Sequence, residues 1–287
     1  MPKKHLLYFL ALITLIAFGA NSVLTRLAIA AGDTGPWSFA LLRFTSGAIV
    51  LSLLIGLHAE KQKSAWRAGG WMSAAALLIY GVFFSYAYLM LDAGAGALIL
   101  FAVVQFTMLG IGFFAGDRLS LSQWLGFFIA AAGLIYLLSP GLSAPPLLGA
   151  VMMSAAGIGW GLYSVFGKKG TADPIAKTCG NFQRAALLLL LASPAILALL
   201  PEPLPTVKGV LLSLLCGGVT SALGYALWYR VLKDMSITAA AISQLTVPII
   251  AALGGVLFVA EPLTQRFVFA SIFTLGGVGL AMFKKSA

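Results

Sequence analysis

The chain has 287 residues, of which 61% are hydrophobic and 9% are charged, and its mean hydropathy is +1.01. Because soluble domains carry about 25% charged residues, this composition excludes a soluble protein and indicates an integral membrane protein. The formal net charge of +10 is compatible with a nucleic-acid partner, but its distribution along the chain gives a different explanation below. The two cysteines, Cys179 and Cys216, are far apart in apolar stretches, so the sequence indicates neither a disulfide framework nor a metal site.

Ten apolar runs of about 19 to 26 residues follow one another along the chain, and each is long enough to cross a hydrocarbon core of ~30 Å as a helix. The first run follows two lysines as a signal peptide would, but it is about twice as long as a signal peptide's apolar region and contains Asn21 and Arg26, so we predict a true span. The sequence therefore predicts an all-α polytopic membrane protein with ten transmembrane helices. The predicted spans are residues 6–30, 36–57, 68–91, 94–115, 121–139, 146–167, 176–200, 207–232, 238–259 and 265–283.

The positions of lysine and arginine predict the orientation of these spans. If the N-terminus is cytoplasmic, thirteen of the 18 basic residues fall at inner ends of spans, whereas the outer loops contain only Lys208 and Arg266. The positive-inside rule then predicts that both termini are cytoplasmic. The basic charge is explained by this topology and by contact with anionic membrane lipid, so we expect no nucleic-acid partner.

Residues 139–146, Ser-Pro-Gly-Leu-Ser-Ala-Pro-Pro, separate two related halves. Four fragments before this junction reappear after it at an offset of about 141 to 144 residues. The paired fragments are 21–26 with 163–168, 42–49 with 182–187, 86–100 with 229–243, and 116–120 with 260–264. Because each half contains five spans, an odd number, the second half enters the membrane from the opposite side. We therefore predict two inverted five-helix repeats, residues 1–140 and 146–287, which together form one transport domain.

Several of these fragments carry a resemblance to a known family. Residues 17–26 are Ala-Phe-Gly-Ala-Asn-Ser-Val-Leu-Thr-Arg, and residues 159–165 are Gly-Trp-Gly-Leu-Tyr-Ser-Val. Residues 244–248, Gln-Leu-Thr-Val-Pro, precede Ala-Glu-Pro-Leu-Thr at 260–264, whereas the first repeat has Asp117-Arg118 in place of Glu261-Pro262. In this order the fragments resemble EamA-type permeases, the ten-helix branch of the drug/metabolite transporter superfamily. The resemblance implies a metabolite permease with a cavity between the halves. More narrowly, the aromatic-rich middle spans look like the YddG branch, which exports aromatic amino acids.

Helical spacing predicts which side chains face such a cavity. Phe18 and Asn21 lie on one face of the first span, and the matching face of the sixth span presents Trp160 and Tyr163. Rings with polar tips suit an amphipathic solute that contains a ring, whereas amides also join helices to one another, and plain helix packing would produce the same pattern. The candidate substrate-binding residues are Asn21, Tyr80, Phe84, Phe101, Gln105, Trp160, Tyr163, Tyr225 and Gln244.

Two arginines, Arg43 and Arg184, occupy equivalent positions in the repeats, seven or eight residues inside their spans. A charge at that depth costs on the order of 3 kcal/mol, so each arginine needs a partner. Either they snorkel or bind neighbouring helix ends, or they bind the carboxylate of a substrate. All eight acidic residues fall at span ends or in loops, which disfavours a proton-coupled exporter of cationic drugs and favours a neutral or zwitterionic solute.

The sequence contains no catalytic constellation within the spans and no Walker motif, so we expect neither an enzyme nor a bound cofactor or metal. We predict a permease of the bacterial inner membrane that exports amino acids, most of all aromatic ones, by alternating access through a central cavity. One alternative is a permease for another small metabolite, such as a nucleoside or sugar derivative. A second is a membrane sensor or lipid-binding protein that transports nothing. The sequence determines no oligomeric state, and a monomer is compatible with it.

Overall fold

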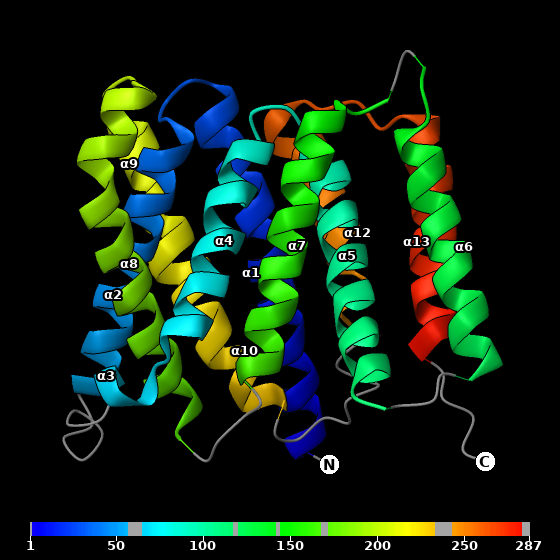
Figure 1. The fold of residues 1–287 in the computed structure, drawn as a ribbon, viewed down its shortest axis with the longest axis horizontal. Helices are drawn as coiled ribbons and strands as arrows, with labels where there is room; N and C mark the ends of the chain where they lie inside the picture. Colours follow the sequence, from blue (N-terminus) through cyan, green and yellow to red (C-terminus); the bar gives the residue numbers. More distant parts are fainter. Residues whose placement is uncertain are drawn as a thin grey trace.

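The computed structural model describes residues 2–56, 65–116, 120–141, 144–167, 172–232 and 243–282, and every element in these ranges is a helix (Figure 1). Labels α and η denote α-helices and π-helices. The elements are α1 (Pro2–Ala30), α2 (Pro36–Gly56), α3 (Ala65–Ala68), α4 (Trp71–Ala87), α5 (Ala93–Phe114), α6 (Leu121–Leu138), α7 (Leu147–Gly167), α8 (Pro174–Leu199), α9 (Val207–Leu214), η2 (Leu215–Leu223), α10 (Gly224–Leu232), α12 (Val247–Gly254), η3 (Gly255–Val259) and α13 (Gln265–Met282).

Within these ranges, seven helical segments are long and apolar enough to cross a membrane, and three shorter ones are equally apolar. The long segments are Leu6–Ala30, Pro36–Gly56, Ala93–Phe114, Leu121–Leu138, Leu147–Gly167, Pro174–Leu199 and Val207–Trp228. The shorter ones are Trp71–Ala87, Val247–Val259 and Gln265–Ala281. Together they correspond one to one with the ten runs of the sequence, so the prediction of an all-α polytopic membrane protein is confirmed. The predicted third span, residues 68–91, differs in detail, because α4 covers only Trp71–Ala87 and the short helix α3 precedes it.

Equivalent helices of the two halves run in opposite directions (Figure 1). In Figure 1 α1 begins and α13 ends at the same end of the bundle, the end near both termini labels, whereas α7 begins at the opposite end, after the connection that follows α6. The closest helix pairs all join one half to the other: α6 with α13, α4 and α5 with α7, α2 with α8, and α1 with α12. The two halves therefore share one packed interior between them.

Glycine permits the most extensive of these helix–helix contacts, between α6 and α13. A Cβ atom on Gly126 would collide with the carbonyl oxygen of Gly277, and a Cβ atom on Gly277 would collide with the carbonyl oxygen of Gly126. Small residues at such crossings let helix backbones approach closely, and in lipid this close packing replaces the hydrophobic driving force between helices. A larger residue at either position would force the two helices apart.

Two of the spans contain π-helical segments, which are rare and occur frequently at functional sites. The span 207–232 consists of α9, η2 and α10, and α12 continues directly into η3. Ala260 ends η3 with a left-handed backbone conformation, φ 57°. The segment η2 supplies Thr220 and Ser221 to the interior, and both side chains are buried there.

Candidate functional site

A small cavity lies between the halves, and residues from α1, α4, α5, α7 and α10 line it. We call its lining the central site: Phe18, Asn21, Ser22, Tyr80, Phe84, Leu100, Phe101, Trp160 and Tyr225. The cavity has a volume of about 20 Å³, which is enough for roughly one water molecule. A solute with a ring therefore requires the surrounding side chains or helices to move apart.

Aromatic rings make up most of the central site. The Trp160 ring centroid lies 4.9 Å from the ring centroids of both Tyr80 and Tyr225. Phe18 meets Tyr225 edge-on at 5.7 Å, and Phe84 lies 5.2 Å from Tyr80. These separations are typical of favourable aromatic pairs. The rings come from both halves of the chain, so a relative movement of the halves would change the width of the site.

Arg43 lies behind this aromatic wall and is 1% exposed. Its Nε donates to Ser221 Oγ at 3.0 Å and its Nη2 donates to the Tyr80 hydroxyl at 3.0 Å. The guanidinium carbon lies 5.2 Å from the Tyr80 ring centroid and 5.1 Å from that of Phe84. Its Nη1 is buried without a hydrogen-bond partner. Among the residues that the structure describes, no carboxylate forms an ion pair with Arg43, so its charge is balanced only by neutral hydroxyl groups and rings.

Asn21 connects α1 to η2 at the side of the central site. Its Oδ1 accepts hydrogen bonds from Thr220 Oγ1 at 2.6 Å, from Ser221 Oγ at 3.1 Å and from Cys216 Sγ at 3.3 Å. A chain of hydrogen bonds thus runs from Asn21 through Ser221 to Arg43. The sequence places Ser221 on the helix face of Tyr225, four residues later, but it predicts neither the contact of Ser221 nor that of Thr220 with Asn21.

Six of the nine predicted substrate-binding residues line the central site together: Asn21, Tyr80, Phe84, Phe101, Trp160 and Tyr225. Tyr163 is buried next to them, with its ring 5.5 Å from that of Trp160. Gln105 lies elsewhere, in a small pocket between α5, α6 and α13. Gln244 is partly exposed just before α12 and does not line the central site.

Arg184, the repeat equivalent of Arg43, has different surroundings. Its guanidinium carbon lies 4.0 Å from the Trp66 ring centroid and 5.2 Å from that of Trp71. Its Nη1 donates to the carbonyl oxygen of Gly180, in the preceding turn of α8. None of these groups lines the central site. The hydrogen bond of Arg184 is thus within α8 and not to a neighbouring helix end, and its ring contacts are with α3 and the start of α4.

The profile of the EamA-like transporter family matches this chain twice, over residues 5–139 and over residues 147–283. The chain belongs to the EamA-like transporter family. It is therefore a membrane transporter and not an enzyme, and the resemblance to EamA-type permeases is confirmed. The narrower resemblance to the YddG branch stays a prediction. In the described ranges, no group of three or more His, Cys, Asp or Glu residues is placed to hold a metal ion.

The sequences of several relatives align with most of the length of this EamA-like transporter. An uncharacterized protein of Pseudomonas aeruginosa is 44% identical over 98% of this chain and 96% of that relative. The uncharacterized transporter YoaV of Bacillus subtilis is 22% identical and covers 88% of each chain. An uncharacterized transporter of Archaeoglobus fulgidus is 24% identical over 72% of this chain and 74% of its own. A solved crystal structure of a protein with 21% identity has a TM-score of 0.64 over 93% of this chain and 94% of that chain, which shows the same fold.

At the end of the transporter opposite the termini, charged residues join the two halves. Arg26 Nε donates to Glu261 Oε1 at 2.9 Å, and Arg26 Nη2 lies 3.6 Å from Asp92 Oδ1. Arg26 Nη1 also donates to the carbonyl oxygen of Tyr88 at 2.8 Å, and the Ala93 N–H donates to Glu261 Oε2 at 2.8 Å. We call Arg26, Asp92 and Glu261 the latch. It fastens α1 and the connection before α5 to the loop between η3 and α13, and this end must loosen if a solute is to pass.

Burial raises the pKa of the Glu261 carboxyl above its ordinary value, although the hydrogen bonds from the Ala93 N–H and from Arg26 lower it. The Asp92 carboxylate nearby raises it further. The desolvation of the charged carboxylate therefore outweighs the stabilisation that the latch gives it.

Proposed function

We propose that this transporter exports amino acids, aromatic ones in particular, by alternating access, and that Arg43 binds their carboxylate. The observation that carries the proposal is the buried guanidinium of Arg43, which has no carboxylate partner among the described residues and an unpaired Nη1. A buried charge is costly unless it is paired, and within a membrane-spanning segment such a charge is typically functional. The carboxylate of a solute would supply the missing counter-charge, in the geometry that guanidinium groups favour.

The rings of the central site support an aromatic solute. The ring centroid of Trp160 lies 4.9 Å from those of Tyr80 and Tyr225. An inserted ring would replace ring–ring contacts within the protein by contacts of the same kind with the solute. No carboxylate of the described residues lines the central site. The ammonium group of an amino acid would therefore make cation–π contacts with the faces of the rings. A nucleoside or a sugar derivative would leave the charge of Arg43 unpaired.

The contracted cavity and the antiparallel halves support alternating access. A site for a small organic molecule occupies about 300–1,000 Å³, whereas the central site has about 20 Å³. Oppositely oriented repeats allow one site between them to open to either side in turn. The latch joins the two halves at one of these sides.

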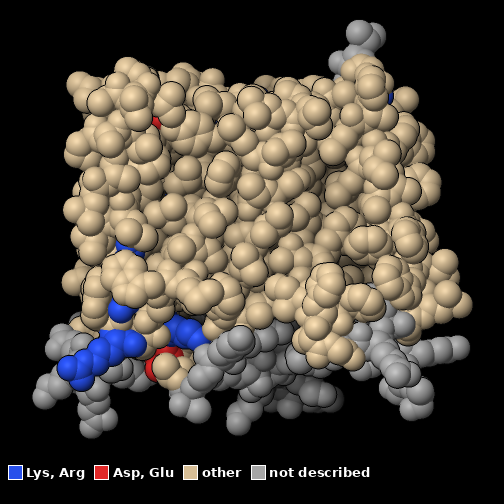
Figure 2. All heavy atoms as spheres, in the orientation of Figure 1, with Lys and Arg blue, Asp and Glu red and all other residues tan. Residues whose placement is uncertain are grey.

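We infer that this transporter lies in the bacterial inner membrane with both termini in the cytoplasm, so that export proceeds through the latched end. Basic side chains support this orientation. Lys and Arg atoms visible in Figure 2 gather mainly at the end of the bundle that holds the termini. The positive-inside rule assigns that end to the cytoplasm.

Proteoliposomes that contain only this protein test the proposal. We expect counterflow of labelled tryptophan and phenylalanine, and weak or absent counterflow of tryptamine, which keeps the ring and the ammonium but lacks the carboxylate. Counterflow of nucleosides or sugars in place of aromatic amino acids would establish the alternative permease. An absence of counterflow for the whole panel, with a correctly inserted protein, would favour a sensor or lipid-binding role.

A further inference from the structure

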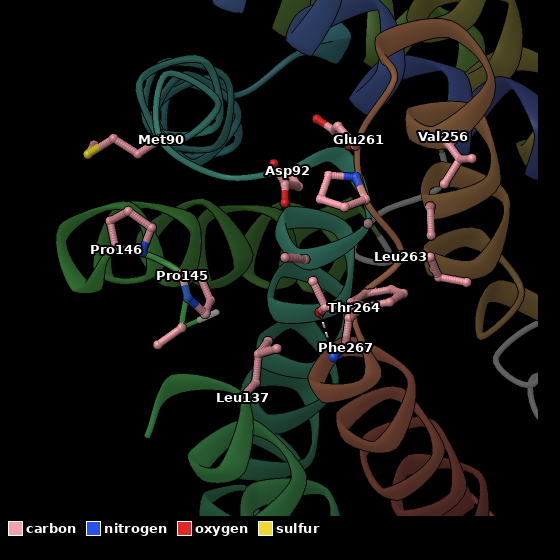
Figure 3. A pocket seen from close by; sticks show the side chains of 15 residues that line it. Met90, Asp92, Leu137, Pro145, Pro146, Val256, Glu261, Leu263, Thr264 and Phe267 are labelled. Atoms are coloured by element: carbon pink, nitrogen blue, oxygen red, sulfur yellow. Dashed lines mark hydrogen bonds between the residues drawn. The ribbon is translucent and has the colours of Figure 1, made fainter. Parts of the chain in front are cut away.

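A second and larger cavity lies at the latched end of the bundle, outside the central site (Figure 3). Its volume is about 320 Å³, within the range of sites for small organic molecules. Figure 3 shows Pro145 and Pro146 on one side of it, Val256 and Leu263 on the other, and Asp92 between them. We call this cavity the vestibule. Its walls come from α5, α6, α12, η3, α13 and the segment before α7, so it spans both halves of the transporter.

The vestibule is mostly apolar, but two carboxylates belong to its wall. Glu261 is engaged on both oxygens, by Arg26 Nε at 2.9 Å and by the Ala93 N–H at 2.8 Å, and its side chain is 8% exposed. Asp92 is different, because its side chain is 47% exposed and lies 3.6 Å from Arg26 Nη2, longer than a hydrogen bond. Asp92 also precedes α5 at the N-cap position, where its side chain accepts no cap hydrogen bond from the backbone. Its carboxylate is therefore available to a ligand.

The charges around the vestibule leave an excess of one negative charge. Asp92 and Glu261 carry two negative charges, and Arg26 supplies one positive charge. Arg266, the first basic residue after Glu261 in the sequence, does not line the vestibule. It donates to the carbonyl oxygens of Leu137 and Ser139 at the end of α6. The vestibule thus offers an anionic group next to apolar walls, whereas the central site has rings with the cation Arg43 behind them.

We propose that the vestibule is a second binding site, for an aromatic ammonium: the ammonium group pairs with Asp92, and the ring packs against Phe267, Leu137 and the prolines. This proposal deepens the proposed function and takes from it the identity of the solute, an aromatic amino acid in passage. The two sites then recognise opposite ends of the same zwitterion. Arg43, behind the rings of the central site, holds the carboxylate, and in the vestibule Asp92 holds the ammonium.

Occupation of the vestibule would act on the latch. Asp92 is the more distant of the two carboxylates bound by Arg26, so an ammonium at Asp92 replaces the weaker of the two ion pairs. This removes one contact between α1 and the start of α5 while the Arg26–Glu261 pair remains. A solute in the vestibule therefore favours the loosening of the end through which it leaves.

Binding of two probes of opposite charge to the full-length protein in lipid nanodiscs tests the vestibule by calorimetry. The probes are phenethylamine, which carries only the ammonium, and 3-phenylpropionate, which carries only the carboxylate. We expect Asp92→Asn to weaken phenethylamine binding by about fivefold, as for an ion pair with a half-exposed carboxylate, and to leave 3-phenylpropionate binding unchanged. Asp33→Asn is the matched control, because Asp33 lies near the same end and pairs with Lys208 at 2.7 Å, outside the vestibule. It should leave both affinities unchanged.

Two further variants test whether phenethylamine binds in the vestibule or in the central site, and whether a loss of binding reflects misfolding. Val256→Trp fills the vestibule without removing a latch residue, so it should abolish phenethylamine binding, and it decides the matter alone if Asp92→Asn does not fold. Trp160→Ala should retain phenethylamine binding. Equal affinity of the wild type and Asp92→Asn for phenethylamine would overturn the proposal, as would loss of that binding in Trp160→Ala.

These outcomes are independent of the proposed function. Asp92-dependent binding of phenethylamine in a protein that carries no aromatic amino acid would retain the vestibule and refute the function. Counterflow of tryptophan together with phenethylamine binding that is insensitive to Asp92 and Val256 would do the reverse.

Discussion

Replacement of Arg43 by methionine tests whether its guanidinium group binds the substrate or stabilises the fold. The variant Arg43→Met removes the charge and preserves most of the volume of the side chain. Of the two hydroxyl partners of Arg43, Ser221 keeps another hydrogen bond, because its Oγ donates to Asn21 Oδ1 at 3.1 Å. The substitution therefore leaves the Ser221 hydroxyl with a partner.

The free energy of unfolding should change little in Arg43→Met. The two hydrogen bonds of the guanidinium, both at 3.0 Å, stabilise the fold by about 1.5–3 kcal/mol each. The burial of the charge costs on the order of 3 kcal/mol, and a buried methionine contributes about 1.5–3 kcal/mol of its own. The sum of these terms lies between a loss of about 1.5 and a gain of about 3 kcal/mol, so we expect no large destabilisation. Loss of the charge-assisted bonds to a carboxylate, about 1.5–3 kcal/mol, should by contrast weaken tryptophan binding by about 10- to 150-fold.

Arg184→Met is the matched control, because Arg184 occupies the equivalent position of the second repeat. Its guanidinium lies 4.0 Å from the Trp66 ring centroid, and such a contact is worth about 0.5–2 kcal/mol. This variant should unfold at a lower temperature than the wild type and should bind tryptophan with unchanged affinity. Calorimetric titration with tryptophan and thermal unfolding of the purified proteins measure the two quantities separately. The reasoning is refuted if Arg43→Met is the unstable variant and binds normally, or if both variants weaken binding equally.

Three further predictions concern the central site, the coupling and the latch. Trp160→Ala should lower tryptophan counterflow at least tenfold, whereas Gln244→Ala, outside the central site, should retain it, and equal effects of the two would place the solute elsewhere. Because no carboxylate of the described residues lines the central site, counterflow should persist when the pH gradient is collapsed, and strict dependence on that gradient would instead implicate Asp92 or Glu261. The pKa of Glu261 is raised above its ordinary value of 4.5, so the stability that its protonation contributes is fully present below pH 4.5 and is lost as the pH rises through the raised pKa. Acidification from pH 7 should therefore stabilise the wild type relative to Glu261→Gln in thermal unfolding, and a relative loss of stability would show that the ion pair with Arg26 outweighs burial.

The sequence by itself determined the class of the protein, the number of its spans and most of its central site. With 61% hydrophobic and 9% charged residues, no arrangement of the chain could keep its surface in water. The class of the protein therefore followed from composition, without knowledge of which residues contact one another. The ten spans followed from the length that a helix needs to cross the bilayer. Phe18, Asn21 and Trp160 could be assigned to cavity-facing positions because helical periodicity is a local property.

Only the tertiary structure decided which neighbour each of these faces meets. Arg43 and Arg184 are equivalent in the repeats, yet one lies behind the rings of the central site and the other against Trp66. Gln105 lies one turn from Phe101 on the same helix, but that turn packs towards α6 and α13. Arg26 and Glu261 are 235 residues apart in the chain and 2.9 Å apart in space. Periodicity fixes the side of a helix on which a residue lies, whereas the residue that it contacts depends on which helices pack together, and that is a property of the whole fold.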